Sequence, residues 1–185
     1  QHPGLFRMVS EHTGETALHV ASQRGSVRFV EHIMDLYPDA VSCRNNRGGH
    51  LPVHLAAIYG NLEVIRHYCT RFPDIIHEPG NHGEVLIHYA AQRGHAETVE
   101  FLLSIDKSGA TKFDSRSMLP IHLASYSYES NHDVIEVLCD VYPESINIRN
   151  GQDHRLPIEI ALQQQAGNPL HFSNHATIDF LRDMM

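Results

Sequence analysis

The stretch Leu51-Pro52-Val53-His54-Leu55-Ala56 decides the fold, because altered copies of it return along the 185-residue chain. The copies begin at Thr16, Val85, Leu119 and Leu156, so the period is about 34 residues. The last copy has Glu159 where the others have histidine. A period of this length is typical of stacked supersecondary units, each of which buries its apolar side against its neighbours. The sequence therefore predicts a repeat array.

The first three units each predict two helices separated by a glycine. In the first unit, a helix over residues 17–24 is ended by Gly25, because glycine readily adopts the positive φ that ends a helix. A second helix over 27–36 has its apolar residues at helical spacing, and Pro38 ends it. The next two units repeat this order, with helices expected at 52–59, 62–71, 86–93 and 96–105.

The array is expected to form one domain over residues 1–185. Residues 1–13 are interpreted as the end of a truncated preceding repeat, so the N-terminal face of the array is expected to be uncapped and apolar. Two places depart from the pattern: residues 126–131 predict a longer loop or an extended first helix, and 166–173 separate helices at 158–165 and 175–184. The five expected repeats are 14–47, 48–82, 83–116, 117–153 and 154–185.

Two antiparallel helices, a glycine between them and an extended finger before a Thr-Pro-Leu-His-like start resemble the ankyrin repeat. The resemblance covers nearly the whole chain. It implies an all-α ankyrin-repeat solenoid of about five helix-turn-helix units with extended, β-hairpin-like fingers. It also implies that the motif histidines bridge backbone groups of neighbouring fingers. These histidines are His19, His54, His88 and His122.

The first helices differ from the family in how they begin. The family's threonine hydroxyl usually caps this helix, and only Thr16 keeps it here. The other units have Leu51, Val85, Leu119 and Leu156 at this position. A lost hydroxyl cap costs about 0.5–2 kcal/mol unless another group replaces it. We predict that at least one of these four helices has no side-chain cap from that residue.

Composition restricts the function. The formal charge of −8 argues against a general nucleic-acid-binding surface. No apolar run approaches the length of a membrane span, so no membrane insertion is expected, and no signal peptide is visible. The three widely spaced cysteines, Cys43, Cys69 and Cys139, fit reduced thiols, which favours an intracellular place in the cytoplasm or nucleus.

The sixteen histidines invite a metal hypothesis, but four of them are the motif histidines. The pairs His50/His54 and His171/His175 each lack a nearby third ligand of the kind that zinc prefers. No phosphate loop, nucleophile elbow or metalloprotease motif occurs in the sequence. We therefore expect no metal, no cofactor and no enzymatic activity within these residues.

Candidate binding residues are those that vary in the family and face the concave side, at the finger tips and the ends of the first helices. Over these positions five arginines stand against Glu15, Glu84 and Asp153, a net charge of +2. Tyrosine and arginine are enriched at interface hot spots. The residues predicted to bind a partner are Arg24, Arg47, His50, Ile58, Tyr59, His82, Glu84, Gln92, Arg93, Arg116, Met118 and Tyr126.

The favoured hypothesis is a monomeric, non-catalytic module that binds another protein through this concave face. We expect the largest share of binding from Tyr59, Arg93, Arg116 and Tyr126, with the arginines contacting acidic groups of the partner. Two alternatives remain open. The array is a structural spacer between flanking domains, or it is an autoregulatory segment of a larger, enzymatic protein.

Overall fold

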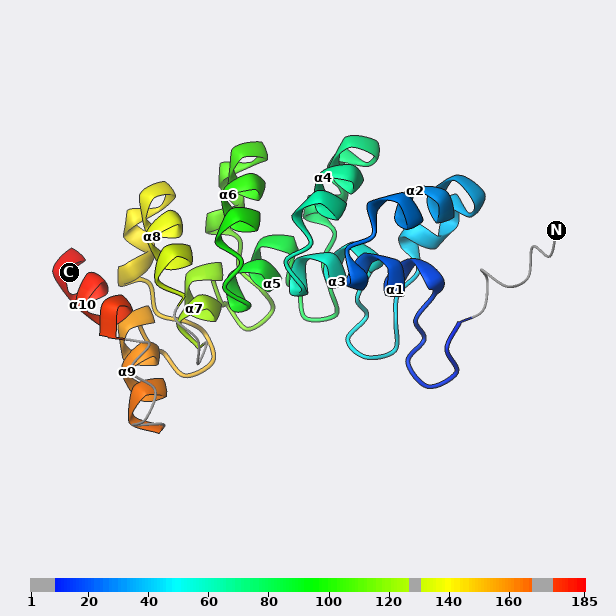
Figure 1. Ribbon diagram of the computed structural model, residues 1–185. Helices are drawn as coiled ribbons and strands as arrows, with labels where there is room; N and C mark the ends of the chain where they lie inside the picture. Colours follow the sequence, from blue (N-terminus) through cyan, green and yellow to red (C-terminus); the bar gives the residue numbers. More distant parts are fainter. Residues whose placement is uncertain (1–8, 127–130, 168–174) are drawn as a thin grey trace. The chain divides into compact units, whose positions relative to one another are not determined.

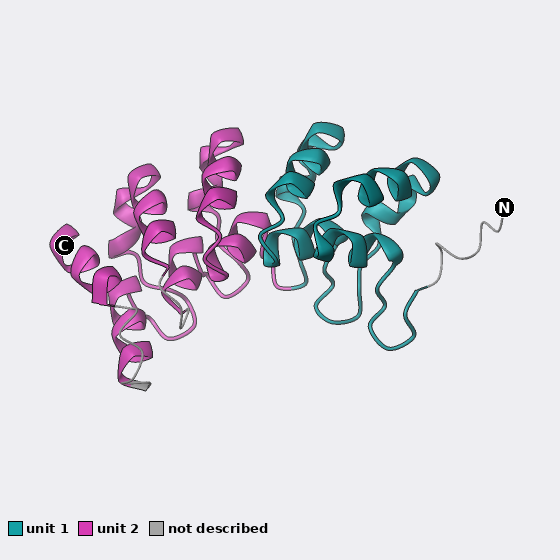
Figure 2. Ribbon diagram, in the orientation of Figure 1, with its two compact units in different colours: residues 1–81 teal, residues 82–185 magenta. Residues whose placement is uncertain are grey.

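The computed structural model describes residues 9–126, 131–167 and 175–185 of the chain. It divides into two compact units, residues 1–81 (unit 1) and 82–185 (unit 2), which are coloured separately in Figure 2. The described residues form α-helices and short 3-10 turns, with no strand among them. The predicted all-α solenoid of helix pairs is confirmed.

Unit 1 holds two helix pairs. The first helices of the two repeats pack against each other, and so do the second helices. The core between them is apolar and includes Leu18, Ile33 and Ile65, all fully buried. One polar contact lies inside it, where Ser22 Oγ lies 2.8 Å from the hydroxyl of the buried Tyr68. The elements are α1 (Ala17–Arg24), α2 (Val27–Leu36), η2 (Pro38–Ser42), α3 (Pro52–Ile58), α4 (Leu62–Arg71) and η3 (Pro73–His77).

Unit 2 continues the same pattern over three further repeats. Its first helices α5, α7 and α9 pack in sequence, as do the second helices α6, α8 and α10, and Figure 1 shows the finger loops below the first helices. The elements are α5 (Leu86–Gln92), α6 (Ala96–Ile105), η4 (Lys107–Thr111), α7 (Pro120–Ser125), α8 (His132–Val141), η5 (Pro143–Asn147), α9 (Pro157–Gly167) and α10 (His175–Met184).

The second helices end where the sequence indicates. Tyr37, Phe72 and Tyr142 leave the helical region at φ near −140°, and the proline that follows each of them starts a 3-10 turn. The third repeat has no proline there. Instead, Asp106 Oδ1 accepts a hydrogen bond from the Ser108 backbone N–H at 2.9 Å and begins the same turn. A side-chain cap thus replaces the fixed backbone angle of proline.

The fingers are closed by backbone and side-chain hydrogen bonds, with no strand among the described residues. Asn45 Oδ1 accepts from the His50 N–H at 3.0 Å, and Asn150 Oδ1 accepts from the Arg155 N–H at 3.2 Å. In unit 1 the Asn46 N–H donates to the Thr13 carbonyl of the preceding finger at 2.8 Å. Each finger therefore has a fixed shape and a fixed register on its neighbour.

The observed first and last residues of the helices agree with those predicted from the sequence to within two residues. The prediction about caps is confirmed, because Leu51, Val85 and Leu119 make no side-chain cap. Three expectations fall on residues 1–8, 127–130 and 168–174, which lie outside the described residues. They concern the truncated repeat, the long loop of the fourth unit and part of the irregular connection in the fifth.

Three apolar side chains of the first repeat, Val20, Phe29 and Leu36, are about half-exposed. Val20 occupies the motif position that Leu123 occupies in the fourth repeat, yet Val20 is 45% exposed and Leu123 only 3%. The same position is therefore buried where a repeat packs in front of it.

This difference gives a test of the stacking energy. We expect Leu123→Ala to lower the free energy of unfolding by about 2–5 kcal/mol, because it leaves a cavity between repeats. Val20→Ala, the matched change at the exposed position, should cost about 0.5 kcal/mol or less. Urea unfolding followed by circular dichroism measures both. Equal losses would contradict burial between repeats as the source of stability.

Candidate functional site

The motif histidines each make two backbone hydrogen bonds. His54 Nδ1 accepts from the Leu51 N–H at 3.0 Å, and His54 Nε2 donates to the Glu78 carbonyl of the next finger at 2.9 Å. The imidazole therefore caps its own helix, where the leucine side chain has no acceptor, and fixes the following finger. The same pair of bonds is made by His19 to Thr16 and His50, by His88 to Val85 and Lys112, and by His122 to Leu119 and Ile148.

This geometry requires a neutral ring, because Nδ1 must accept while Nε2 donates. Burial lowers the pKa of all four motif histidines, and it lowers that of His54 to about 4. These side chains are fully buried. They are therefore part of the scaffold and are not available to a ligand.

Glu159 shows what changes when the histidine is replaced. Its Oε2 accepts from the Leu156 N–H at 2.8 Å and from Arg149 Nη1 at 2.9 Å. The carboxylate thus keeps the cap of the helix, but it has no proton to donate to a further finger. Arg149, in the finger that precedes this helix, donates to the carboxylate instead.

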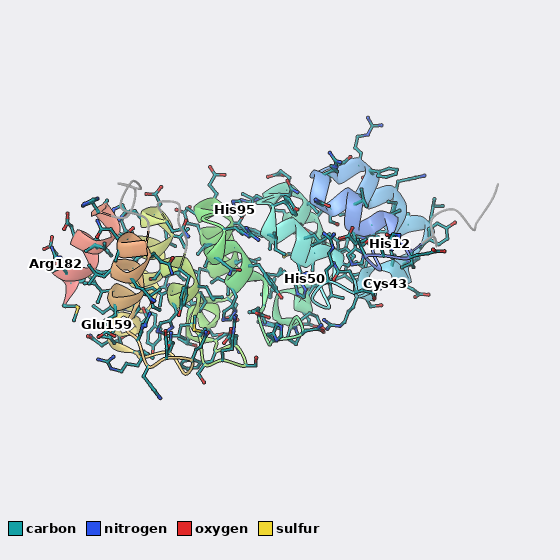
Figure 3. The ribbon with its side chains drawn as sticks, turned by 90° about the horizontal axis from the view of Figure 1, so that it is seen from below. His12, Cys43, His50, His95, Glu159 and Arg182 are labelled. Carbon is teal, nitrogen blue, oxygen red and sulfur yellow. The ribbon has the colours of Figure 1, made fainter. Side chains whose placement is uncertain are left out.

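Figure 3 looks onto the side of the fingers and marks His50 in unit 1 and Glu159 in unit 2. We call the finger tips and the C-terminal ends of the first helices the finger face of each unit. On the finger face of unit 1, Arg24 and Arg47 are exposed and make no ion pair within the described residues. Tyr59 is 52% exposed, while His50 and Ile58 are partly exposed. The His50 ring meets the His54 ring edge-on at 6.3 Å.

Two of these residues occupy the same place in successive repeats. Arg24 and Tyr59 each close a first helix and directly precede the glycine of their repeat. Asn61 holds the two helix ends together, because its Nδ2 donates to the Ser22 and Gln23 carbonyls of the preceding repeat, both at 2.8 Å. We call Arg24 and Tyr59 the helix-end pair of unit 1.

This contact explains the glycine that follows Arg24. Gly25 has φ of 74°, and a Cβ added to it would lie 2.6 Å from Asn61 Oδ1. A side chain at this position would therefore displace the asparagine. Glycine here supplies both the backbone angle and the space for the bridging amide.

Unit 2 has the equivalent helix-end pair, Arg93 and Tyr126. Asn131 Nδ2 donates to the Ala91 carbonyl at 3.1 Å and to the Ala124 carbonyl at 3.2 Å, so one amide joins the two helix ends. Arg93 is exposed and makes no ion pair among the residues that the structure describes. Tyr126 is only partly exposed, and its hydroxyl lies 3.5 Å from Asp153 Oδ2.

Arg116 has a different environment from the one expected of a binding arginine. Its Nη2 donates to Asp114 Oδ2 at 2.8 Å and to Glu84 Oε1 at 3.1 Å, and its Nε donates to Asp114 Oδ2 at 3.0 Å. Asp114 is buried and its Oδ1 accepts the Arg116 and Met118 backbone N–H groups. The guanidinium therefore neutralises two carboxylates inside the finger and carries no uncompensated positive charge.

Two predicted binding residues are buried. Glu84 is 8% exposed and is held by Arg116, with the Tyr89 hydroxyl 3.4 Å away. Met118 is 1% exposed. The expectation that these two side chains are accessible to a partner is wrong. His82 and Gln92, by contrast, are exposed.

The bridging asparagines are the residues that the sequence interpretation missed. Asn61 and Asn131 share one repeat position, directly before the second helix. An asparagine there in alternate repeats is a visible signal, but it also fits an ordinary helix cap. Neither side chain caps its own helix, and the amide points back to the preceding repeat.

Unit 1 also has an open cavity of about 620 Å³, which lies away from the helix-end pair. Its lining includes Val41, Phe72 and Ile75, together with the side chains of Arg44 and Arg71. Both arginines are occupied, since Arg71 pairs with Asp35 at 2.7 Å and Arg44 binds the Pro79 carbonyl at 2.7 Å. The guanidinium groups that line this cavity are therefore already paired within unit 1.

Two general searches of the described residues complete the description. They contain no group of three histidine, cysteine, aspartate or glutamate side chains placed to hold a metal ion. They also contain no helix that is long and apolar enough to cross a membrane.

Residues 67–150 match the family model described as ankyrin repeats (3 copies). The comparison with curated proteins finds no match to the chain. The matched region begins within α4 and ends in the finger that follows η5.

The motif histidines predict a loss of stability in mild acid. The pKa of His54 is 6.5 when unfolded and about 4 when folded, so between these values only the unfolded chain binds the proton. The contribution of His54 to the free energy of unfolding is therefore fully present above pH 6.5, and it falls as the pH is lowered toward 4. From pH 7 to pH 5 we expect His54 alone to cost about 2 kcal/mol.

Urea unfolding at a series of pH values measures this loss. His54→Gln removes one titrating group but keeps an acceptor and a donor, so it should reduce the pH dependence, to which the other three motif histidines still contribute. His32→Gln, on the exposed side of α2, is the matched control and should leave the dependence unchanged. Identical pH profiles for the two variants would refute the assignment to His54.

The Arg116 cluster predicts a second effect on stability. Arg116→Ala leaves Asp114 and Glu84 buried without a counter-charge, so we expect unfolding to become easier by about 1–3 kcal/mol. Adding Glu84→Gln should restore part of this loss, because one unpaired carboxylate is then removed. Arg182→Ala breaks an exposed ion pair with Asp179 and should lower the free energy of unfolding by about 0.5 kcal/mol or less. Thermal unfolding of the four proteins decides whether Arg116 is structural.

Proposed function

The chain carries ankyrin repeats over residues 67–150, and from that premise we propose that it is a protein-binding module that uses the finger face of unit 1. Ankyrin repeats generally mediate protein–protein interaction, and such domains are typically non-enzymatic. The proposal concerns which surface of this chain does so. The partner is a protein, and the module performs no chemistry on it.

The observation that carries the proposal is the helix-end pair of unit 1. Tyr59 is half-exposed although it is a large aromatic side chain, and Arg24 beside it makes no ion pair within the described residues. Tyrosine and arginine dominate binding energies at protein interfaces, because each combines a large contact area with a polar group. Neither side chain is needed for the core of unit 1.

Rigid support strengthens this proposal. The backbone at Arg24 and Tyr59 is fixed by the Asn61 amide and by the helix ends themselves. A surface that is already ordered loses little conformational entropy on binding, so more of the contact energy appears as affinity. Exposed aromatic residues on flexible loops would lack this advantage.

The arginines of the sequence prediction now separate into two groups. Arg24, Arg47 and Arg93 are exposed and make no ion pair within the described residues, so they support contact with acidic groups of a partner. Arg116 neutralises Asp114 and Glu84 and supports the shape of its finger instead. The proposed contact set is therefore Arg24, Arg47 and Tyr59, with Arg93 as the corresponding residue of unit 2.

Affinity capture with quantitative mass spectrometry tests the proposal. The double variant Arg24→Glu/Tyr59→Ala should lose at least one protein that the unaltered chain captures, by about tenfold, which corresponds to 1.4 kcal/mol. The matched control is Arg28→Glu/Phe29→Ala, with the same two changes at exposed positions of α2. It should retain that protein. Circular dichroism verifies that both variants are folded.

Two outcomes would contradict the proposal. In the first outcome, the finger-face variant retains every protein that the unaltered chain captures. In the second, both variants lose the same proteins equally. The first outcome favours a structural spacer, and the second places binding on a surface that includes α2.

A further inference from the structure

The surface around the helix-end pair of unit 1 has a polar half, at the end of α1, and an apolar half, at the end of α3. Gln23 and Arg24 end the first helix of repeat one, and Ile58 and Tyr59 occupy the equivalent positions of repeat two. An amide and a guanidinium thus stand beside an aliphatic side chain and an aromatic ring. A segment that binds across both repeats has to present an acidic group to one half and an apolar group to the other.

The distance between the halves restricts the conformation of that segment. Packed helices lie about 8–10 Å apart, and α1 packs directly on α3. A polyproline II helix rises about 3.1 Å per residue with three residues per turn, so side chains three residues apart lie on one side at about 9 Å. A β-strand brings side chains to one side only at about 7 or 13 Å. The polyproline II spacing matches the repeat.

The chemistry of the two halves fits the same conformation. Aromatic rings such as that of Tyr59 pack well against proline in peptide recognition, and the extended polyproline II backbone leaves carbonyls free for donors such as the Gln23 amide. Arg24 makes no ion pair among the described residues, so its guanidinium is available for a carboxylate. Glu11 and Glu15 lie in the first finger, before α1 begins.

Resting on the proposed function, we propose that the unit-1 finger face binds an acidic, proline-containing segment of its partner in the polyproline II conformation. A carboxylate of the segment contacts Arg24, and a proline three residues away packs on Tyr59. A polyproline II helix presents similar contact groups in either chain direction. The acidic residue of the segment therefore either precedes or follows the proline in sequence. Arg47, in the neighbouring finger, adds positive charge to the same face.

Unit 2 supplies an internal comparison. Its pair Arg93 and Tyr126 has the same order, but Tyr126 is partly buried and its hydroxyl lies near the Asp153 carboxylate. Arg155 pairs with that carboxylate at 3.2 Å, and less of the Tyr126 ring is accessible to proline than in unit 1. The weaker site is therefore the one in unit 2, and the difference between the two pairs is itself measurable.

Fluorescence anisotropy with labelled peptides tests the proposal on the full chain. The probes are short peptides of Glu-x-x-Pro and Pro-x-x-Glu repeats with x alanine or serine. The control peptides replace glutamate with lysine or place one residue between glutamate and proline. We expect saturable binding of a three-spaced acidic peptide, weakened about tenfold or more by Arg24→Glu and by Tyr59→Ala. Higher salt should weaken it too, because the arginine contact is exposed.

Matched variants locate the site. Arg28→Glu and Phe29→Ala should leave the affinity within about twofold, since contacts outside a hot spot are nearly neutral. Arg93→Glu should weaken binding less than Arg24→Glu does. The proposal is overturned by the absence of saturable binding, by equal binding of the lysine or one-residue-spaced peptides, or by equal effects of Arg24→Glu and Arg28→Glu.

Failure of this inference differs from failure of the proposed function. If the peptides do not bind but capture of a protein still depends on Arg24 and Tyr59, the finger face binds a partner of another kind. If capture is also unaffected by those changes, the finger face itself is the wrong surface.

Discussion

The structure depends on a buried, neutral imidazole that makes one hydrogen bond to its own helix and one to the next finger. In repeats two to four the residue that begins the first helix is leucine or valine, which cannot accept a backbone hydrogen bond. The histidine Nδ1 takes that role, and Nε2 fixes the finger that follows. Helix start and finger position are thereby set by a single side chain, and removing its neutral form disturbs both. Glu159 shows the limit of this arrangement, because a carboxylate caps the helix but cannot donate onward.

The second constraint acts at the other end of the same helices. Asn61 in unit 1 and Asn131 in unit 2 bind carbonyls at the end of the preceding repeat's first helix, and the glycine opposite each leaves space for the amide. The motif histidine fixes one end of the helix and the asparagine fixes the other. The backbone that closes these helices is therefore held in place, and in unit 1 the side chains of Arg24 and Tyr59 are exposed. That combination suits recognition, because the contact groups are already placed before a partner arrives.

Much of this could be read from the sequence. The period, the glycines and the aromatic-proline pairs place the helices to within two residues, because each signal acts locally on the backbone. The sequence interpretation also places Arg24 and Tyr59 on an accessible face. It fails for Glu84, Arg116 and Met118, since their environment is set by groups that are distant in sequence. Arg116 meets Glu84 across 32 positions, and no local pattern shows that the two are paired.

The distribution of arginine follows from these constraints. Arg116, in a finger, is paired with the buried Asp114, whereas Arg24 and Arg93, which close first helices, meet the negative end of the helix dipole. The dipole stabilises the cation there without binding it in one geometry, so the guanidinium stays available. The same residue type therefore supports the fold at Arg116 and stays exposed at Arg24 and Arg93. The accessible Tyr59 beside Arg24 distinguishes the finger face of unit 1 from that of unit 2.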